Sequence, residues 1–169
     1  MVSKFDLKSS FWQLGIHSED RCKIGFCIPN HHFQSTVMPF RLKTTPALFQ
    51  NTMICIFHPI LHSALIYIDD ILLFSSTFEE HIKLLYQFAD IVKNFGVMLS
   101  KKKMNLAKKE INFLGKKISD GSCTPEQYIG ESILHFLEEN LSKTQIQQFL
   151  GIVNYAETSS LKPLGSSIP

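Results

Sequence analysis

The sequence lacks the features that mark several classes of protein. Its 169 residues include one Trp and only four Cys, and 17 basic against 15 acidic residues leave a net charge of just +2. Irregularly spaced cysteines in a chain of this length do not suggest a secreted disulfide framework. With 44% hydrophobic residues, disorder is excluded as the dominant state. We therefore expect a globular protein from a reducing compartment.

Long hydrophobic runs are also missing. The longest, Ala64 to Phe74, is interrupted by Asp69 and Asp70, and a membrane-spanning helix needs about 20 apolar residues. The first residues show no basic segment followed by an apolar one, so a secretory leader is not indicated. The sequence has no nucleotide P-loop, dinucleotide fingerprint or nucleophile elbow. We expect an intracellular protein with no membrane partner, and the sequence leaves its location otherwise open.

Positive charge is concentrated in one segment. Residues 1–82 carry six basic and seven acidic side chains, whereas residues 83–120 carry nine basic and three acidic ones. Seven lysines lie between Lys101 and Lys117. This density is typical of a surface that binds a polyanion such as nucleic acid. A solvated lysine-rich hairpin would show the same pattern, so charge alone does not decide.

Hydrophobic periodicity and turn residues predict alternating strands and helices. Short apolar runs predict strands over residues 4–7, 24–28, 33–38, 64–68, 71–74 and 111–118, the last as a strand pair. Three helices have recognisable starts: Thr45 as N-cap before Pro46, the capping box of Thr77 and Glu80, and Ser142 with Gln145. Gly96 ends the second helix. This order predicts an α+β fold with helices on one face of an antiparallel sheet.

Three acidic residues interrupt apolar strands. Asp69 and Asp70 separate two strongly apolar runs, and Asp6 lies between Phe5 and Leu7. If these strands are neighbours in the sheet, the three carboxylates converge, and hard oxygen ligands of this kind suit Mg²⁺. The alternative is that Asp69 and Asp70 only form a hairpin turn, where Asp is common, and that Asp6 is a surface acid.

Five motifs in a fixed order resemble the reverse transcriptase family. The resemblance is greatest to the polymerases of plant pararetroviruses (caulimovirus-like) and gypsy-type LTR retrotransposons. The matching segments are residues 4–13 with Tyr67-Ile-Asp-Asp70, residues 38–50, residues 96–104, Phe113-Leu-Gly115, and residues 147–155.

This resemblance implies a polymerase palm with part of the fingers and the start of a helical thumb. The palm would occupy residues 1–120, with the partial fingers at about 13–45. Residues 121–155 would begin the thumb or connection, and residues 156–169 would form a loose tail. The implied function is that of an RNA-directed DNA polymerase fragment from an integrated retroelement.

The resemblance also implies the catalytic residues. Asp6, Asp69 and Asp70 would be the catalytic and metal-binding carboxylates, with two Mg²⁺ ions and Mn²⁺ as a possible substitute. Such a site transfers a nucleotide to a primer 3′-OH. The implied partners are an RNA or DNA template with its primer, deoxynucleotide triphosphates, and the fingers and RNase H segments of a parent polyprotein.

Further positions follow from the same motifs. Residues implied to contact the nucleotide are Phe11, Arg41, Gln50, Tyr67 and Lys103, and the implied primer grip is Phe113, Leu114 and Gly115. Phe11 would exclude a 2′-OH by shape, although a core aromatic is the alternative. Lys103 would lie near the leaving pyrophosphate, with Lys101 and Lys102 as close rivals.

One position departs from the family pattern. Arg41 stands where the family has glycine, which allows the backbone to approach substrate closely. Met1 lies just before the first catalytic motif, and we therefore expect the fingers portion to be missing and this chain alone to be inactive. The alternative function is a catalytically inactive remnant, at most a weak nucleic-acid-binding protein.

Overall fold

The computed structural model of the chain describes residues 1–119, 122–125 and 142–160. The chain divides into two compact units, residues 1–107 and 108–169, and each is described by itself. Across the described ranges, no helix combines the length and the apolar character needed to cross a bilayer.

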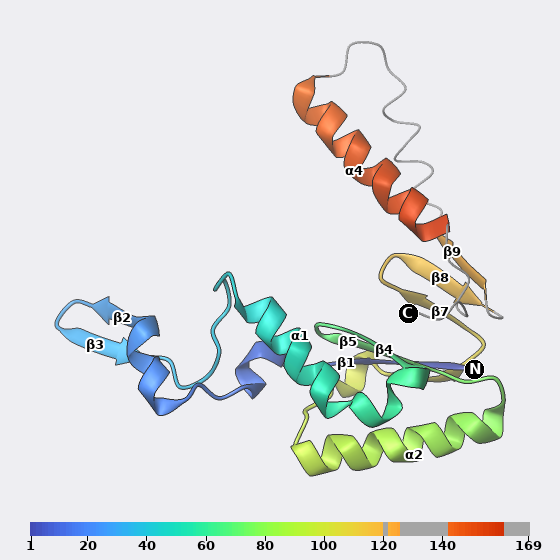
Figure 1. Cartoon of the computed structure of the whole chain (residues 1–169), viewed down its shortest axis with the longest axis horizontal. Coiled ribbons are helices and arrows are strands. Elements are labelled where there is room, and N and C mark those ends of the chain that lie inside the picture. The colour runs from blue at the N-terminus through green and yellow to red at the C-terminus, as the bar shows by residue number, and fades with distance from the viewer. Residues whose placement is uncertain (120–121, 126–141, 161–169) are drawn as a thin grey trace. The chain divides into compact units, whose positions relative to one another are not determined.

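The first unit is built on a four-stranded sheet with the order β4-β5-β1-β6. The strands are β1 (Val2–Asp6), β4 (Ala64–Tyr67), β5 (Asp70–Phe74) and β6 (Asn105–Lys108). The pairs β1–β5 and β4–β5 are antiparallel (Figure 1). β1 and β6, from opposite ends of this unit, are therefore neighbours in the sheet. The antiparallel pairing expected from the sequence is confirmed for β1–β5 and β4–β5.

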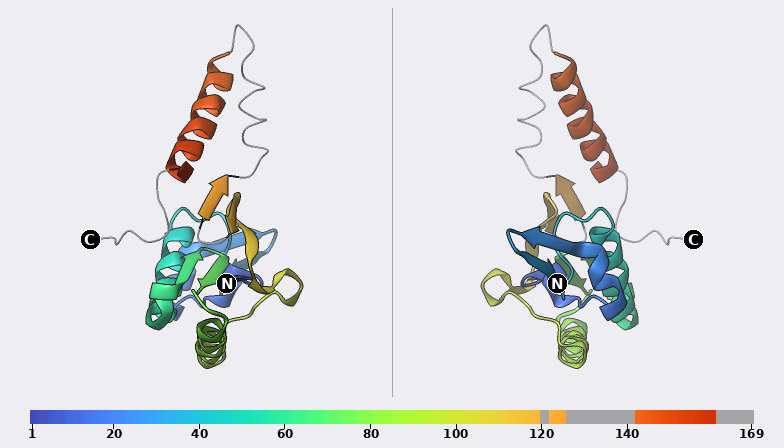
Figure 2. Two further views of the ribbon diagram at one scale, coloured as in Figure 1. Left: turned by 90° about the vertical axis from the view of Figure 1, so that its right-hand side faces the viewer. Right: turned by 90° about the vertical axis from the view of Figure 1, so that its left-hand side faces the viewer.

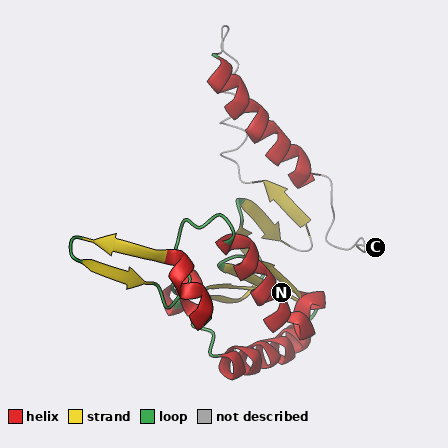
Figure 3. Cartoon of the chain, turned by 60° about the vertical axis from the view of Figure 1, so that its left-hand side comes forward, coloured by secondary structure: helices red, strands yellow, loops and turns green. Residues whose placement is uncertain are grey.

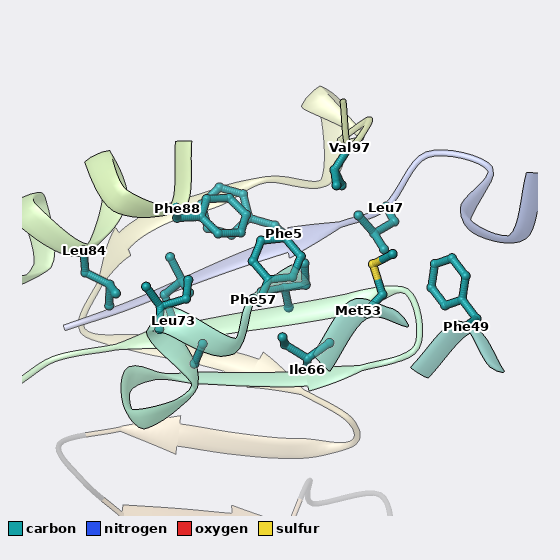
Figure 4. Close-up of a cluster of buried hydrophobic side chains, with 13 residues drawn as sticks. Phe5, Leu7, Phe49, Met53, Phe57, Ile66, Leu73, Leu84, Phe88 and Val97 are labelled. Atoms are coloured by element: carbon teal, nitrogen blue, oxygen red, sulfur yellow. The ribbon is translucent and has the colours of Figure 1, made fainter. Parts of the chain in front are cut away.

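Two helices cover one face of this sheet. They are α1 (Thr45–Ile56) and α2 (Phe78–Phe95). Because side chains alternate along a strand, Phe5 and Ile71 share a face, and they pack with residues of both helices (Figure 4). The Phe5 and Phe88 rings lie 4.3 Å apart between centroids. The expected packing of helices against one sheet face is confirmed.

The ends of α2 follow the sequence signals. The Glu80 N–H donates to Thr77 Oγ1, the Thr77 N–H donates to Glu80 Oε2, both at 3.2 Å, and Gly96 ends the helix at φ 67°. The N-cap of α1 is Thr44 and not Thr45. Thr45 is instead the first residue of the helix, and its hydroxyl donates to the Pro39 carbonyl at 3.4 Å.

A buried polar chain joins α2 to the sheet. His81 has no exposed surface, and its Nε2 and Nδ1 lie 2.7 Å and 2.9 Å from the hydroxyls of Ser3 and Ser75. The Ala107 N–H donates to Ser3 Oγ at 2.9 Å, and the Ser75 hydroxyl donates to the Thr77 carbonyl. A neutral imidazole satisfies every member of this chain, and burial lowers the pKa of His81 below 6.5.

The segment before α1 forms a separate hairpin of β2 (Gly25–Ile28) and β3 (His31–Gln34) (Figure 3). The two-residue turn is Pro29-Asn30, with Asn30 at φ 64°, a combination typical of a type II turn. Because the turn is this short, β3 begins at His31 and ends at Gln34, earlier than the predicted strand over 33–38. Every residue of both strands is exposed.

The second unit contains a three-stranded sheet and a helix. The strands β7 (Glu110–Phe113), β8 (Lys116–Ser119) and β9 (Ser122–Pro125) pair in that order, and α4 (Lys143–Ser160) contacts β9 (Figures 1 and 2). Gln145 accepts from the backbone and hydroxyl of Ser142, as the predicted cap requires. The helix continues to Ser160, five residues into the predicted loose tail, and residues 161–169 lie outside the described part.

Candidate active site

The register of β1 and β5 brings two of the predicted carboxylates together. Asp6 is the direct cross-strand partner of Asp70. Because side chains alternate, Asp6 and Asp70 lie on the sheet face opposite to the one that carries Phe5 and Ile71. Asp69 lies in the turn that joins β4 to β5, and its carbonyl accepts from the Leu7 N–H at 2.8 Å. The three acids therefore converge at the ends of neighbouring strands.

The turn that carries Asp69 is strained and clamped. Tyr67 pairs with Asp70, so only Ile68 and Asp69 form the loop, and Ile68 has φ 49°. A left-handed conformation at a β-branched residue costs about 1–3 kcal/mol. The Gln50 carboxamide holds it: its Nε2 donates to the Ile66 carbonyl at 2.8 Å, and the Ile68 N–H donates to its Oε1 at 2.7 Å. Gln50 therefore fixes the position of Asp69.

Two lysines pair with the outer carboxylates. Lys103 Nζ lies 3.0 Å from Asp6 Oδ2, and Lys4 Nζ lies 3.2 Å from Asp70 Oδ1. The hydrogen bond to Asp6 raises the pKa of Lys103, and the nearby negative charges act in the same direction. The Ser100 N–H donates to the Asp6 carbonyl at 2.8 Å, and this contact holds the 3-10 helix Lys101–Lys103 close to β1.

One oxygen of the cluster stays unpaired. Asp69 Oδ1 is buried and has no hydrogen-bond partner among the described residues. A buried, unpaired carboxylate oxygen is costly unless a cation or a donor reaches it. The donor set thus fits a hard cation such as Mg²⁺. In the described ranges, however, no three His, Cys, Asp or Glu side chains are arranged to hold a metal. The oxygen donors suit such a cation, and in the arrangement described Asp6 and Asp70 are each paired with a lysine.

The residues implied to contact the nucleotide lie in the first unit. Tyr67 is half exposed and pairs with Asp70 in the β-ladder, so it shares the carboxylate face. Phe11 packs edge-on against Phe40 and Phe49, with centroids 5.4 Å and 5.1 Å away. Its ring is partly buried against the core, so the structure is compatible with both interpretations of Phe11.

Arg41 has a backbone conformation that favours glycine. It is exposed and has φ 69°, a backbone region that glycine enters readily and that costs other residues roughly 1–2 kcal/mol. The expected departure from the family pattern therefore falls on a residue with a strained backbone.

The predicted primer grip is the turn of a hairpin in the second unit. Leu114 and Gly115 join β7 to β8 with φ values of 49° and 69°, as in a type I′ turn. Phe113, at the end of β7, is buried. Its role at a primer remains a prediction.

One residue of the site, Lys4, was not predicted as a site residue from the sequence. Lys4 lies two positions before Asp6 on one strand, and this period of two places both on the same face. The spacing of Lys4 from Asp6 is the signal that could have identified it.

A comparison with family profiles decides the assignment. Residues 1–118 match the family described as reverse transcriptase (RNA-dependent DNA polymerase). The chain belongs to the reverse transcriptase family. The match includes Asp6, Asp69, Asp70 and Lys103, and it ends in the hairpin of the second unit.

Curated relatives in the reverse transcriptase family are virus polyproteins. The chain is 64% identical over 155 residues to the genome polyprotein of Petunia vein clearing virus (isolate Shepherd), and the match covers 92% of the chain and 7% of the polyprotein. It is 40% identical over 158 residues to the enzymatic polyprotein of Figwort mosaic virus (strain DxS), covering 94% of the chain and 24% of that protein. The chain thus spans less than a quarter of each relative.

Solved reverse transcriptases share the fold. A foamy viral protease-reverse transcriptase in complex with double-stranded DNA is 26% identical, with a TM-score of 0.79 over 92% of this chain and 27% of that one. The same type of enzyme in complex with an RNA/DNA hybrid gives a TM-score of 0.75 at 26% identity, covering 92% of this chain and 21% of that one. The α+β, palm-like fold expected from the sequence is confirmed.

Proposed function

We propose that this chain supplies the carboxylate-bearing palm of an RNA-directed DNA polymerase that transfers nucleotides to a primer 3′-OH. The observation that carries the proposal is the convergence of Asp6 and Asp70 across β1 and β5, with a buried, unpaired Asp69 oxygen at the adjoining turn. Carboxylates gathered in this way can hold the two metal ions of a phosphoryl-transfer centre.

Asp6 and Asp69 would hold two Mg²⁺ ions, with Asp70 as the third carboxylate. When bound, the ions would activate the primer hydroxyl and neutralise the charge of the nucleotide phosphates, and Mn²⁺ would serve in their place. The protein's contribution is to fix the carboxylates: β1 and β5 position Asp6 and Asp70, and the Gln50 clamp positions Asp69 through Ile68.

Other side chains would bind and select the substrate. Phe11, wedged edge-on between two aromatic rings, would exclude a 2′-OH by shape and so select deoxynucleotides. Tyr67 would line the primer side from the carboxylate face. Lys103, whose raised pKa keeps it a cation, would bind the leaving pyrophosphate. The lysines of residues 101–117 would contact the nucleic-acid backbone without reading its sequence.

The whole polymerase needs segments beyond this chain. The curated relatives are several times longer than the matched segment, and template, primer, deoxynucleotide triphosphates, fingers and RNase H segments are the partners we infer. The origin from an integrated element is likewise part of the proposal.

A second candidate is a catalytically inactive remnant that binds nucleic acid weakly. Two observations favour it for the isolated chain. Arg41 places a long cation at a backbone position where the family pattern has glycine, and Lys103 is paired with the carboxylate of Asp6. Both would oppose productive substrate binding.

Primer extension on poly(rA)/oligo(dT) with Mg²⁺ separates the two candidates. The assay compares the isolated chain with a hybrid in which the chain replaces the matching segment of the Petunia vein clearing virus polyprotein, to which it is 64% identical. We expect no extension by the isolated chain and extension by the hybrid. Asp69→Asn should abolish the hybrid's activity, and Asp90→Asn, which changes an exposed acid on α2, should leave it intact.

A folded hybrid that does not extend the primer would contradict the polymerase proposal and favour the remnant. Extension by the isolated chain, lost in Asp69→Asn, would refute the remnant.

A further inference from the structure

Lys4 and Lys103 both pair with acids of the candidate active site, but the protein holds them differently. The Lys103 side chain is 66% exposed and its partner Asp6 17%, whereas the side chains of Lys4 and its partner Asp70 are 23% and 25% exposed, so the difference between the two pairs lies in the lysines. An exposed ion pair is weak and exchanges easily with solvent ions. The shielded pair of Lys4 with Asp70 is less screened and therefore more persistent.

The backbones that carry the two lysines also differ. Lys4 is the middle residue of β1, opposite Leu72, and β1 lies between β5 and β6 in the sheet. Moving Lys4 would require breaking both ladders. Lys103, by contrast, is the last residue of a three-residue 3-10 helix. The Lys103 N–H donates to the Ser100 carbonyl at 3.1 Å. Because the Lys103 side chain is long and exposed, it can turn away from Asp6 while the Ser100 N–H keeps the helix bound to the Asp6 carbonyl.

The charges of the cluster support the same distinction. Three carboxylates and two ammonium groups leave a charge of −1, and exchange of Lys103 for one divalent cation brings this to 0 while Lys4 stays in place. Without Lys4, Asp6 and Asp70 would face each other across the strands, and like charges in that position repel. Asp70 would then be free to take a cation itself.

We propose that Lys4 is a positioning residue that keeps Asp70 as a lysine-paired carboxylate, so that a divalent cation displaces Lys103 and binds Asp6 and Asp69. Lys4 and Asp70 act as one neutral unit beside the metal. This proposal rests on the proposed function, because it assumes that the carboxylates bind a divalent cation.

The test measures Mn²⁺ binding to the full chain by the electron paramagnetic resonance signal of free Mn²⁺, since Mn²⁺ accepts the same oxygen ligands as Mg²⁺. Asp69→Asn should lose binding. Lys4→Met should bind about tenfold more tightly, because a positive charge is removed and Asp70 becomes available. The double variant Lys4→Met/Asp70→Asn removes the neutral unit and should bind within about threefold of the parent. Lys23→Met, which breaks the exposed pair with Asp20, is the control and should match the parent.

Thermal unfolding gives a second readout. Lys4→Met should melt below the parent without metal, and the difference should shrink when Mn²⁺ is added, because the cation replaces the missing ammonium. Lys4→Arg, which keeps the positive charge, should resemble the parent in both assays.

Three results would overturn the inference. One is a double variant that loses Mn²⁺ as completely as Asp69→Asn, because Asp70 would then be a direct ligand. Another is a Lys4→Met variant with unchanged affinity, or with a melting difference that Mn²⁺ does not alter, because Lys4 would then be purely structural. The third is a parent chain that shows no Mn²⁺ binding sensitive to Asp69→Asn. This result would also overturn the metal-binding assumption of the proposed function, whereas the first two results leave that assumption intact.

Discussion

Replacing Gln50 by Met should release the turn that carries Asp69. Met has a similar length but offers no donor or acceptor of comparable strength, so the substitution removes the bonds from Nε2 to the Ile66 carbonyl and from the Ile68 N–H to Oε1. The substitution removes no bond to a carboxylate of the site, because both bonds of Gln50 are to backbone groups of residues 66 and 68.

The magnitude follows from those two bonds and the strain they hold. Each hydrogen bond contributes about 1 kcal/mol net, and the freed groups are partly buried. Ile68 is then free to leave its left-handed conformation at φ 49°, which returns roughly 1 kcal/mol of strain. We expect the free energy of unfolding to fall by about 1 kcal/mol, and the local opening of the turn to become roughly fivefold more frequent.

Two assays check this prediction. Urea unfolding measures the loss of stability, and amide hydrogen exchange measures protection at Ile68, whose N–H has lost its acceptor. Gln87→Met on the exposed side of α2 is the matched control, expected within about 0.5 kcal/mol of the parent. Unchanged protection of the Ile68 amide in Gln50→Met would refute the clamp, whatever the effect on global stability.

Three further predictions concern the first unit. Arg41→Gly should raise the free energy of unfolding by about 0.5 kcal/mol in urea unfolding, because the relief of strain at φ 69° exceeds the entropic cost of glycine; a loss of stability would contradict this. Because burial lowers the pKa of His81, the unfolded chain is protonated first, so stability should fall as the pH drops through about 6.5, and His81→Leu should show a shallower decline in pH-dependent melting. Thr77→Ala should cost about 1 kcal/mol in urea unfolding by removing the bond to the Glu80 N–H, and no measurable change would argue against the capping box.

Local signals predicted the central elements of the fold well. The strands flanking Asp69 are short apolar runs bounded by polar residues, and the capping box of Thr77 with Glu80 marks the start of α2 in sequence and in structure. Each of these features depends on residues only a few positions apart in the chain, so it can be recognised from the sequence.

The exposed hairpin was predicted less accurately. Both faces of β2 and β3 are exposed, so no buried side chain fixes the register of the strands. The polar pair of His31 and His32 therefore looks like part of the turn, although both residues belong to β3.

The candidate active site was predicted in part. The meeting of Asp6 with Asp70 depended on β1 and β5 being neighbours, which is a non-local property of the sheet. The contact of Lys103 with Asp6 was harder to predict, because the two residues are 97 positions apart in the chain. Such a contact depends on where a short helix packs, and no periodicity encodes it.

The two-residue turn between Tyr67 and Asp70 makes the site sensitive to the length of the chain as well as to its acidic side chains. Neighbouring residues on a strand point to opposite faces, so Asp69 and Asp70 both reach the site only because Asp69 precedes the strand. Gain or loss of one codon here would rotate β5 by one position and exchange Ile71 and Leu73 with the acidic face. A single-codon insertion or deletion at this turn would therefore disturb core and site together, whereas a substitution of Ile68 would alter only local strain and packing.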